Sequence, residues 1–267
     1  MAVDAAPGAT AEATHDAFLR GRLELWQPAR GARATMDPLL LAHFVWTTRK
    51  RAALGRVLDL GCGTGVIALA LGLVEASAEL AGVEVVPELA ALARRNAVAA
   101  GARLAVVEGD LTRRDLALPH GAYDTIVANP PYVAHGRGLV SPSADRAAAR
   151  SETACTLADV VEVARRKLDP RGRFCLVLPA SRVAEACTTL ATASFTVCAL
   201  RFVHSFVDEP ARRVLIAAGR GARAAEVDVL PPLVVHVDSG DRKAFTKETA
   251  AILEGEWVES AAGAERA

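Results

Sequence analysis

The residues best suited to chemistry in this sequence follow apolar runs that have the character of strands. The first such run leads into the segment VLDLGCGTG, residues 57–65, where glycines alternate with other residues. Glycine tolerates tight turns and lets a ligand approach the main chain closely. The GxGxG spacing differs from the GxGxxG of a pyrophosphate-binding turn. We therefore predict a ligand-binding turn at Gly61, Gly63 and Gly65.

Three carboxylates accompany this turn at the ends of strand-like runs. Asp59 lies two residues before Gly61, Glu84 ends the next run about twenty residues later, and Asp110 comes at the end of the third. A carboxylate in the position of Glu84 can accept hydrogen bonds from both hydroxyls of a ribose. Asp110 can accept one from an adenine amino group, and Asp59 can order the loop or face the cationic end of a ligand. The set favours a cationic nucleoside ligand without phosphates.

A fourth apolar run ends in Asn129-Pro130-Pro131-Tyr132. Proline has no N–H to give to a sheet, and it restricts the residue before it, so the chain must leave the strand here in a stiff geometry. The Asn129 side-chain oxygen and the Pro130 carbonyl can each accept an N–H from a planar amino group, and Tyr132 can stack on a flat substrate. These positions predict a site that aligns a conjugated, weakly nucleophilic nitrogen for attack.

The elements that must position these residues alternate along the chain. Continuous apolar strands separated by helices predict an α/β fold with a doubly wound, mostly parallel sheet that is covered on both faces. In such a sheet, ligands bind beyond the carboxyl ends of the strands. The expected strands are 56–60, 79–84, 104–109, 123–129, 173–179, 195–203 and 212–218, and the expected helices are 39–45, 64–74, 87–100, 159–168 and 181–192.

The outer parts of the chain have weaker patterns. We expect residues 1–19 to be disordered, 20–253 to form a single domain with a flank over 20–55 and an appendage over 222–253, and 254–267 to be a loose tail. Residues 20–253 hold 30 of the 31 Lys and Arg but 24 of the 31 Asp and Glu, a net charge near +6. This charge permits a nucleic-acid partner without requiring one.

Other features exclude several classes of protein. The five cysteines form no CxxC pair, and no His lies at metal-ligand spacing, so we expect no metal and a reducing, cytoplasmic setting. No signal peptide or membrane-spanning run is expected. The oligomeric state is left open.

The glycine segment resembles the first motif of class I methyltransferases, whose fold is a Rossmann-like, seven-stranded sheet and whose cofactor is S-adenosylmethionine. The resemblance implies that Asp59, Gly61, Gly63, Gly65, Glu84, Asp110 and Asn129 bind this cofactor. The NPPY tetrapeptide resembles the motif of amino-methyltransferases that act on adenine N6, guanine N2 or a glutamine amide. It implies that Asn129, Pro130 and Tyr132 are catalytic.

Flanking segments extend the resemblance to roughly residues 22–253. The order of WQPARGARATMDPLLLAHF (26–44), the two motifs, the segment 149–182 and the segments 200–221 and 230–237 resembles bacterial tRNA (adenine-N6)-methyltransferases that modify valine tRNA beside the anticodon. Structured RNA, most simply tRNA, is then the expected partner. The resemblance implies that Gln27, Arg33 and Asp37 line the cofactor or substrate mouth, and that Arg150 and Glu152, which follow the loop 133–148, also bind substrate.

Three alternatives stay open at this stage. Release-factor glutamine methyltransferases share NPPY but resemble the chain only in its core, and they usually carry an N-terminal helical domain for which few residues remain here. Ribosomal RNA guanine-N2 methyltransferases share the same chemistry. A catalytically silent module that binds S-adenosylmethionine or RNA would require the loss of a motif, and both motifs are intact.

Overall fold

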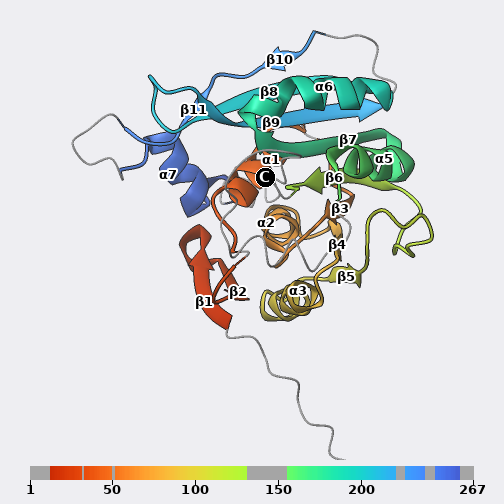
Figure 1. Ribbon diagram of the computed structural model, residues 1–267. Helices are drawn as coiled ribbons and strands as arrows, with labels where there is room; N and C mark the ends of the chain where they lie inside the picture. Colours follow the sequence, from red (N-terminus) through yellow and green to blue (C-terminus); the bar gives the residue numbers. More distant parts are fainter. Residues whose placement is uncertain are drawn as a thin grey trace, which may run out of the picture.

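One large sheet runs through the protein, and its strand order puts the first strand of the α/β unit near the middle (Figure 1). The computed structural model describes residues 13–31, 33–49, 52–130, 155–220, 226–237 and 244–258. Within these residues the sheet has nine strands, in the order β10-β8-β9-β7-β6-β3-β4-β5, with β11 also paired to β8. The strands are β3 (Arg56–Leu60), β4 (Glu79–Glu84), β5 (Leu104–Glu108), β6 (Tyr123–Ala128), β7 (Leu168–Pro179), β8 (Phe195–His204), β9 (Ala211–Arg220), β10 (Asp228–Val229) and β11 (Leu233–Val234).

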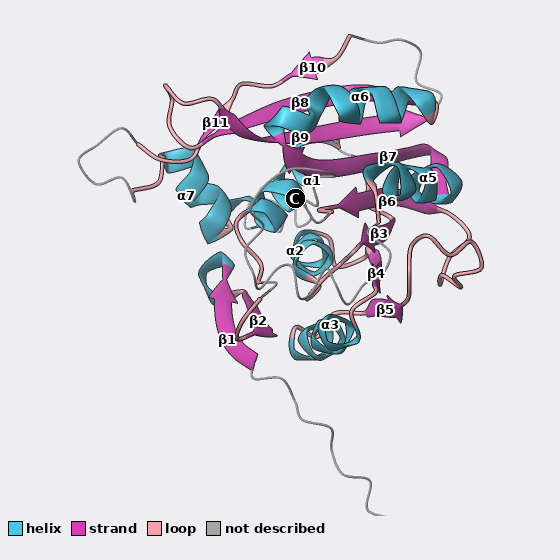
Figure 2. Cartoon of the chain, in the orientation of Figure 1, coloured by secondary structure: helices cyan, strands magenta, loops and turns pink. Residues whose placement is uncertain are grey.

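Helices cover both faces of this sheet (Figure 2). The helices are α1 (Asp37–Thr48), α2 (Val66–Val74), α3 (Pro87–Ala99), α5 (Leu157–Lys167), α6 (Val183–Thr192) and α7 (Lys247–Glu254). One buried core joins α1, α2 and α7 to one face, and a second joins α5 and α6 to the other. Both faces of the strands are therefore apolar, which explains the continuous apolar runs in the sequence.

The predicted doubly wound fold is confirmed, and the differences lie at its margins. The seven long strands β3 to β9 match the expectation, and the short β10 and β11 extend the β8 edge. Strand β9 lies between β7 and β8 and is antiparallel to both. Helix α1 begins at Asp37 with Met36 as its N-cap, two residues before the expected start at Leu39.

The N-terminal boundary differs more. Residues 13–18, which were expected to be disordered, form strand β1 (Ala13–Phe18), which pairs antiparallel with β2 (Leu23–Pro28). The hairpin gains its stability from tertiary packing, since Leu23 and Leu25 are buried against the main core. At the other end, Trp257 and Val258 are also buried, so the expected loose tail does not begin at residue 254.

The described residues contain neither a helix that could span a membrane nor a cluster of side chains that could hold a metal ion. No helix among them is long and apolar enough to cross a bilayer. No group of three or more His, Cys, Asp or Glu side chains in these ranges is arranged to hold a metal ion.

Candidate active site

The predicted site residues follow four neighbouring strands that end at one edge of the sheet. Strand β3 lies between β6 and β4, and Leu60 is in register with Ala128 on one side and Val83 on the other. Strand β5 is parallel to β4, with Glu84 opposite Glu108. From β3 the chain continues to β4 and β5 on one side, and it then returns to β6 and β7 on the other side of β3. This reversal makes the end of β3 and β6 the switch point, where doubly wound sheets bind ligands.

The glycine segment forms a tight turn between β3 and α2. Gly61, Gly63 and Gly65 have φ of +74°, +55° and +87°, a region that side-chain-bearing residues rarely adopt. The N–H groups of Gly61 and Cys62 both donate to the Val83 carbonyl at 2.9 Å, which fixes the turn on β4. Nothing lies within 4 Å of the position that a Cβ would take on Gly61 or Gly63, so this turn borders open space.

Glu84 is held in place by the turn it faces. One carboxylate oxygen accepts from the Gly63 N–H at 2.8 Å, and the other accepts from the Val86 N–H at 2.9 Å. Each oxygen keeps a second lone pair that can accept from a hydroxyl group. The side chain is thus pre-positioned as an acceptor at the end of β4.

Asp59 is fully buried beneath the turn, and neither of its carboxylate oxygens has a hydrogen-bond partner among the described residues. Burial is the main cause that raises the pKa of Asp59 to about 7; the nearby Ala68 backbone opposes this shift, and the charge of Glu84 adds to it. An unpaired buried carboxylate is costly unless a cation compensates it. The two carboxylates, Asp59 and Glu84, accept hydrogen bonds and carry negative charge beside an open glycine turn. This arrangement fits a cofactor that carries a ribose and a positive charge.

The remaining described motif residues lie just beyond the ends of β5 and β6. The Asp110 carboxylate accepts from the backbone N–H and the hydroxyl of Thr112, both at 2.8 Å, just beyond β5. Asn129 is half-buried and Pro130 is buried, directly beyond β6. Tyr132, Arg150 and Glu152 lie outside the described residues.

Two of the predicted mouth residues hold the N-terminal flank together. The Gln27 amide donates to Asp16 at 2.8 Å and accepts from the Ala34 N–H at 2.6 Å, and Arg33 also donates to Asp16, at 2.6 Å. These contacts give Gln27 and Arg33 a structural role, and a role toward substrate stays a prediction for both.

Asp37, the third of these residues, lies at the start of α1 and contacts β9. Its carboxylate accepts from the Arg213 guanidinium at 2.8 Å, so it ties the start of α1 to the start of β9. Sequence reasoning did not single out Arg213 as its partner, because the two residues are 176 positions apart. A role for Asp37 toward substrate likewise remains a prediction.

Asn96 is a buried polar residue that the sequence analysis missed. It lies on the inward face of α3 together with Ala90, Ala93 and Ala97, and it is fully buried. A single amide among alanines on the buried stripe of a helix is the signal that would have found it. Cys62, in contrast, packs on Gly82 as expected of a core residue, and burial raises the pKa of its thiol.

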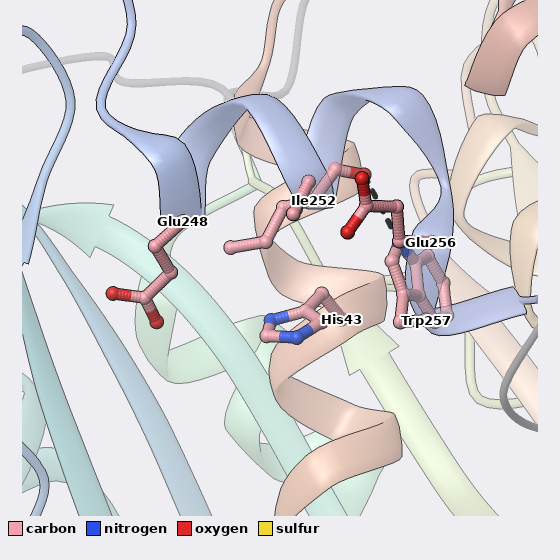
Figure 3. A pocket seen from close by; sticks show the side chains of 6 residues that line it. His43, Glu248, Ile252, Glu256 and Trp257 are labelled. Atoms are coloured by element: carbon pink, nitrogen blue, oxygen red, sulfur yellow. Dashed lines mark hydrogen bonds between the residues drawn. The ribbon is translucent and has the colours of Figure 1, made fainter.

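A cavity of about 270 Å³ lies between α1 and α7 (Figure 3). His43 faces the Trp257 ring in an edge-on arrangement there, with 5.7 Å between ring centroids. Glu248 and Glu256 stand on opposite sides of its opening, and Glu248 is paired with Arg201. None of the predicted site residues lines it.

Comparison with known proteins gives the class of this site. Residues 37–200 match the methyltransferase small domain family. A crystal structure described as a predicted O-methyltransferase from Agrobacterium tumefaciens superposes with a TM-score of 0.64 at 26% identity, covering 82% of this chain and 96% of that one. The fold and the site define a class I methyltransferase, and its cofactor is S-adenosylmethionine.

Full-length relatives narrow the family. A tRNA1(Val) (adenine(37)-N6)-methyltransferase of Aeromonas hydrophila is 32% identical over 76% of this chain and 82% of its own length. One of Porphyromonas gingivalis strain W83 is 28% identical over 84% and 89%. A release factor glutamine methyltransferase of Deinococcus radiodurans is 36% identical, but over only 49% of this chain and 43% of its own. The chain belongs to the methyltransferase small domain family and, within it, to the tRNA1(Val) (adenine(37)-N6)-methyltransferase family.

Proposed function

We propose that this chain transfers a methyl group from S-adenosylmethionine to the N6 amino group of an adenine in tRNA. The observation that carries the proposal is the adjacency of Asn129-Pro130, beyond β6, to the glycine turn beyond β3. An amino group held at the first site lies beside a cofactor held at the second. The names of the full-length relatives make adenine 37 of a valine tRNA the first substrate to test.

The cofactor, when bound, supplies an electrophilic methyl group on a sulfonium. In this proposal Glu84 accepts hydrogen bonds from the ribose hydroxyls, because its carboxylate is already fixed against the glycine turn. Asp110 accepts from the adenine amino group of the cofactor. Asp59 faces the cationic amino acid end, where its buried charge finds compensation. Gly61 and Gly63 leave the space that the nucleoside requires.

Asn129 and Pro130 act on the substrate nitrogen. The amide oxygen of Asn129 and the carbonyl of Pro130 each accept one N–H, which orients the lone pair and stabilises the positive charge that develops at nitrogen. Pro130 is buried, so its carbonyl is held on a rigid support. Tyr132 stacks on the base, and the proton leaves for solvent after transfer, so no strong base is required.

The substrate base must leave its stack before its amino group can reach Asn129. Stacking on an aromatic ring offsets part of that cost. The glutamine alternative is less well supported, because its relative matches only 49% of this chain and 43% of its own length.

The deciding experiment offers labelled cofactor to total tRNA, ribosomal RNA and release factors, followed by analysis of the labelled nucleosides and amino acids. Label in N6-methyladenosine of tRNA supports the proposal. Label confined to methylglutamine would support the release-factor alternative instead. Label at guanine N2 would support the same mechanism with a different substrate base.

The cofactor part is tested separately by calorimetry. Glu84→Ala should weaken binding of S-adenosylmethionine at least tenfold, since it removes a preformed acceptor. Glu88→Ala, an exposed carboxylate in the first turn of α3, is the matched control and should bind as the wild type does. Equal affinities for the two variants would refute the role of Glu84.

A further inference from the structure

Three aromatic rings form one stack near the end of β8. The rings of Phe206 and His236 have centroids 5.4 Å apart with 32° between their planes, and those of His236 and Phe245 are 5.2 Å apart and inclined by 18°. We call this set the aromatic stack. The His236–Phe245 pair is stacked, whereas the Phe206–His236 pair is tilted to a degree similar to that of His15 and Trp26 in the N-terminal hairpin.

Backbone hydrogen bonds hold the three rings in place. The His236 N–H donates to the Ser205 carbonyl at 2.9 Å, which ties the residues after β11 to those after β8. His236 and Phe245 also form an antiparallel bridge. Because three separate segments are fixed to one another, the stack is a preformed surface that a ligand can contact without ordering it first.

The stack is open to solvent on one side. Phe245 is 42% exposed, and Val207 and Val237 beside it are 70% and 37% exposed. Exposed apolar side chains that gather in one place mark binding sites, whereas isolated ones are common on protein surfaces. Such an exposed aromatic surface indicates a binding role more than a packing role.

The stack lies at the same edge of the sheet as the candidate active site. In the strand order, β8 is three strands from β6, which is about 14 Å at the usual spacing of strands. Val203 near the end of β8 is in register with Arg213 on β9, and Arg213 with Pro179 at the end of β7. Figure 1 shows β11 and α7 beside this end of β8.

Two arginines, each already paired with a carboxylate, lie on the edge between the two places. Arg212 and Arg213 begin β9, and the Arg212 side chain is 64% exposed while it contacts Glu209 at 3.3 Å. Guanidinium groups beside exposed rings suit a ligand that carries both phosphates and flat bases. An apolar protein segment would gain little from these charges.

We propose that the aromatic stack is a platform for an unpaired base of the RNA substrate, a nucleotide that flanks the adenine held at Asn129. This inference rests on the proposed function. Any base can stack on Phe245, so the platform contributes affinity and direction of approach without reading sequence. Arg212 would contact the backbone phosphates between the two bases.

The test measures the affinity of the full chain for a labelled anticodon stem-loop of valine tRNA by fluorescence anisotropy, together with the steady-state KM and kcat. Phe245→Ala should weaken RNA binding about tenfold, which corresponds to the loss of one stacked base. KM should rise by a similar factor with little change in kcat, and cofactor affinity should stay at its wild-type value. Phe245→Tyr should restore binding. Val98→Ala, at an 82% exposed position on α3, is the matched control.

A second readout separates stacking from a structural effect. Phe245→Trp should show fluorescence quenching when RNA is added, and Val98→Trp should not. Wild-type RNA affinity of Phe245→Ala would overturn the platform, even if the enzyme methylates adenine. If RNA binding depended on Phe245 but no adenine were methylated, the RNA-binding role of the stack would be supported and the proposed function refuted. If Phe245→Ala lost binding to a release factor but kept its affinity for RNA, the aromatic stack would be a protein-binding surface instead.

Discussion

The Asn96 side chain donates a hydrogen bond to the Thr64 carbonyl, with 2.9 Å between Nδ2 and the oxygen, and so joins helix α3 to the glycine turn. The same amide accepts from the Trp26 N–H at 2.7 Å and donates to the Trp26 carbonyl at 3.0 Å. One buried side chain therefore fixes both the N-terminal hairpin and the loop that would receive the cofactor.

Replacing Asn96 should affect stability and cofactor binding together. Asn96→Ala leaves the buried Thr64 carbonyl and the half-buried N–H and carbonyl of Trp26 without their partner, which should lower the free energy of unfolding by about 3 kcal/mol. The glycine turn loses a support, so affinity for S-adenosylmethionine should also fall. Urea unfolding and calorimetry are the measurements. A variant with wild-type stability would show that the three hydrogen bonds contribute nothing.

Asp59→Asn should separate stability from binding. The pKa of Asp59 in the folded protein, about 7, lies above its ordinary value of 3.8, so the unfolded chain releases the proton first as pH rises. The free energy of unfolding of the wild type should therefore decrease from pH 3.8 to 7 by this contribution.

The asparagine variant lacks this contribution, so without cofactor it should melt at a higher temperature than the wild type at pH 7.5. It should also bind S-adenosylmethionine more weakly, because the compensating charge is gone. Thermal melts over this pH range and calorimetry test the pair of effects. A lower melting temperature together with unchanged binding would contradict the role given to Asp59.

Asn129→Ala should abolish turnover while leaving cofactor affinity nearly intact. Loss of one preorganised polar contact at a developing charge typically costs on the order of a hundredfold in rate. Single-turnover transfer to tRNA and calorimetry with the cofactor are the measurements. Turnover within a few-fold of the wild type would exclude the proposed role.

His43 should make the protein sensitive to mild acid. Burial, together with the smaller effect of the Arg201 charge, lowers the pKa of His43 to about 4, and the charge of Glu248 opposes both effects. As pH falls from 6.5 to 4, the unfolded chain takes up the proton before the folded one. The free energy of unfolding should then fall by as much as about 1.4 kcal/mol per pH unit in this window and by nothing further below it.

His43→Gln provides the comparison for this effect. Glu248 and Glu256, which line the same cavity, are present in both proteins, so the difference between the two stability curves isolates the imidazole. Parallel curves between pH 4 and 6.5 would show that His43 does not titrate differently on folding.

The sequence alone determined the central strands, the helices and the order of the two motifs. These features depend on local properties: apolar runs of strand length, the stop at Asn129-Pro130 and the positive φ that only the glycines of the turn adopt easily. Since motifs that follow parallel strands must meet at one edge, the pattern also predicted that Glu84, Asp110 and Asn129 would share a site.

Only the tertiary structure decided what the outer segments do. The hairpin of β1 and β2 forms because Leu23 and Leu25 find a core and Asn96 binds Trp26, and β10 and β11 form because β8 offers a free edge. The contact of Asp37 with Arg213 and the stack of Phe206, His236 and Phe245 join residues that are distant in sequence. Such contacts depend on which surfaces meet after folding, and no local periodicity encodes that meeting.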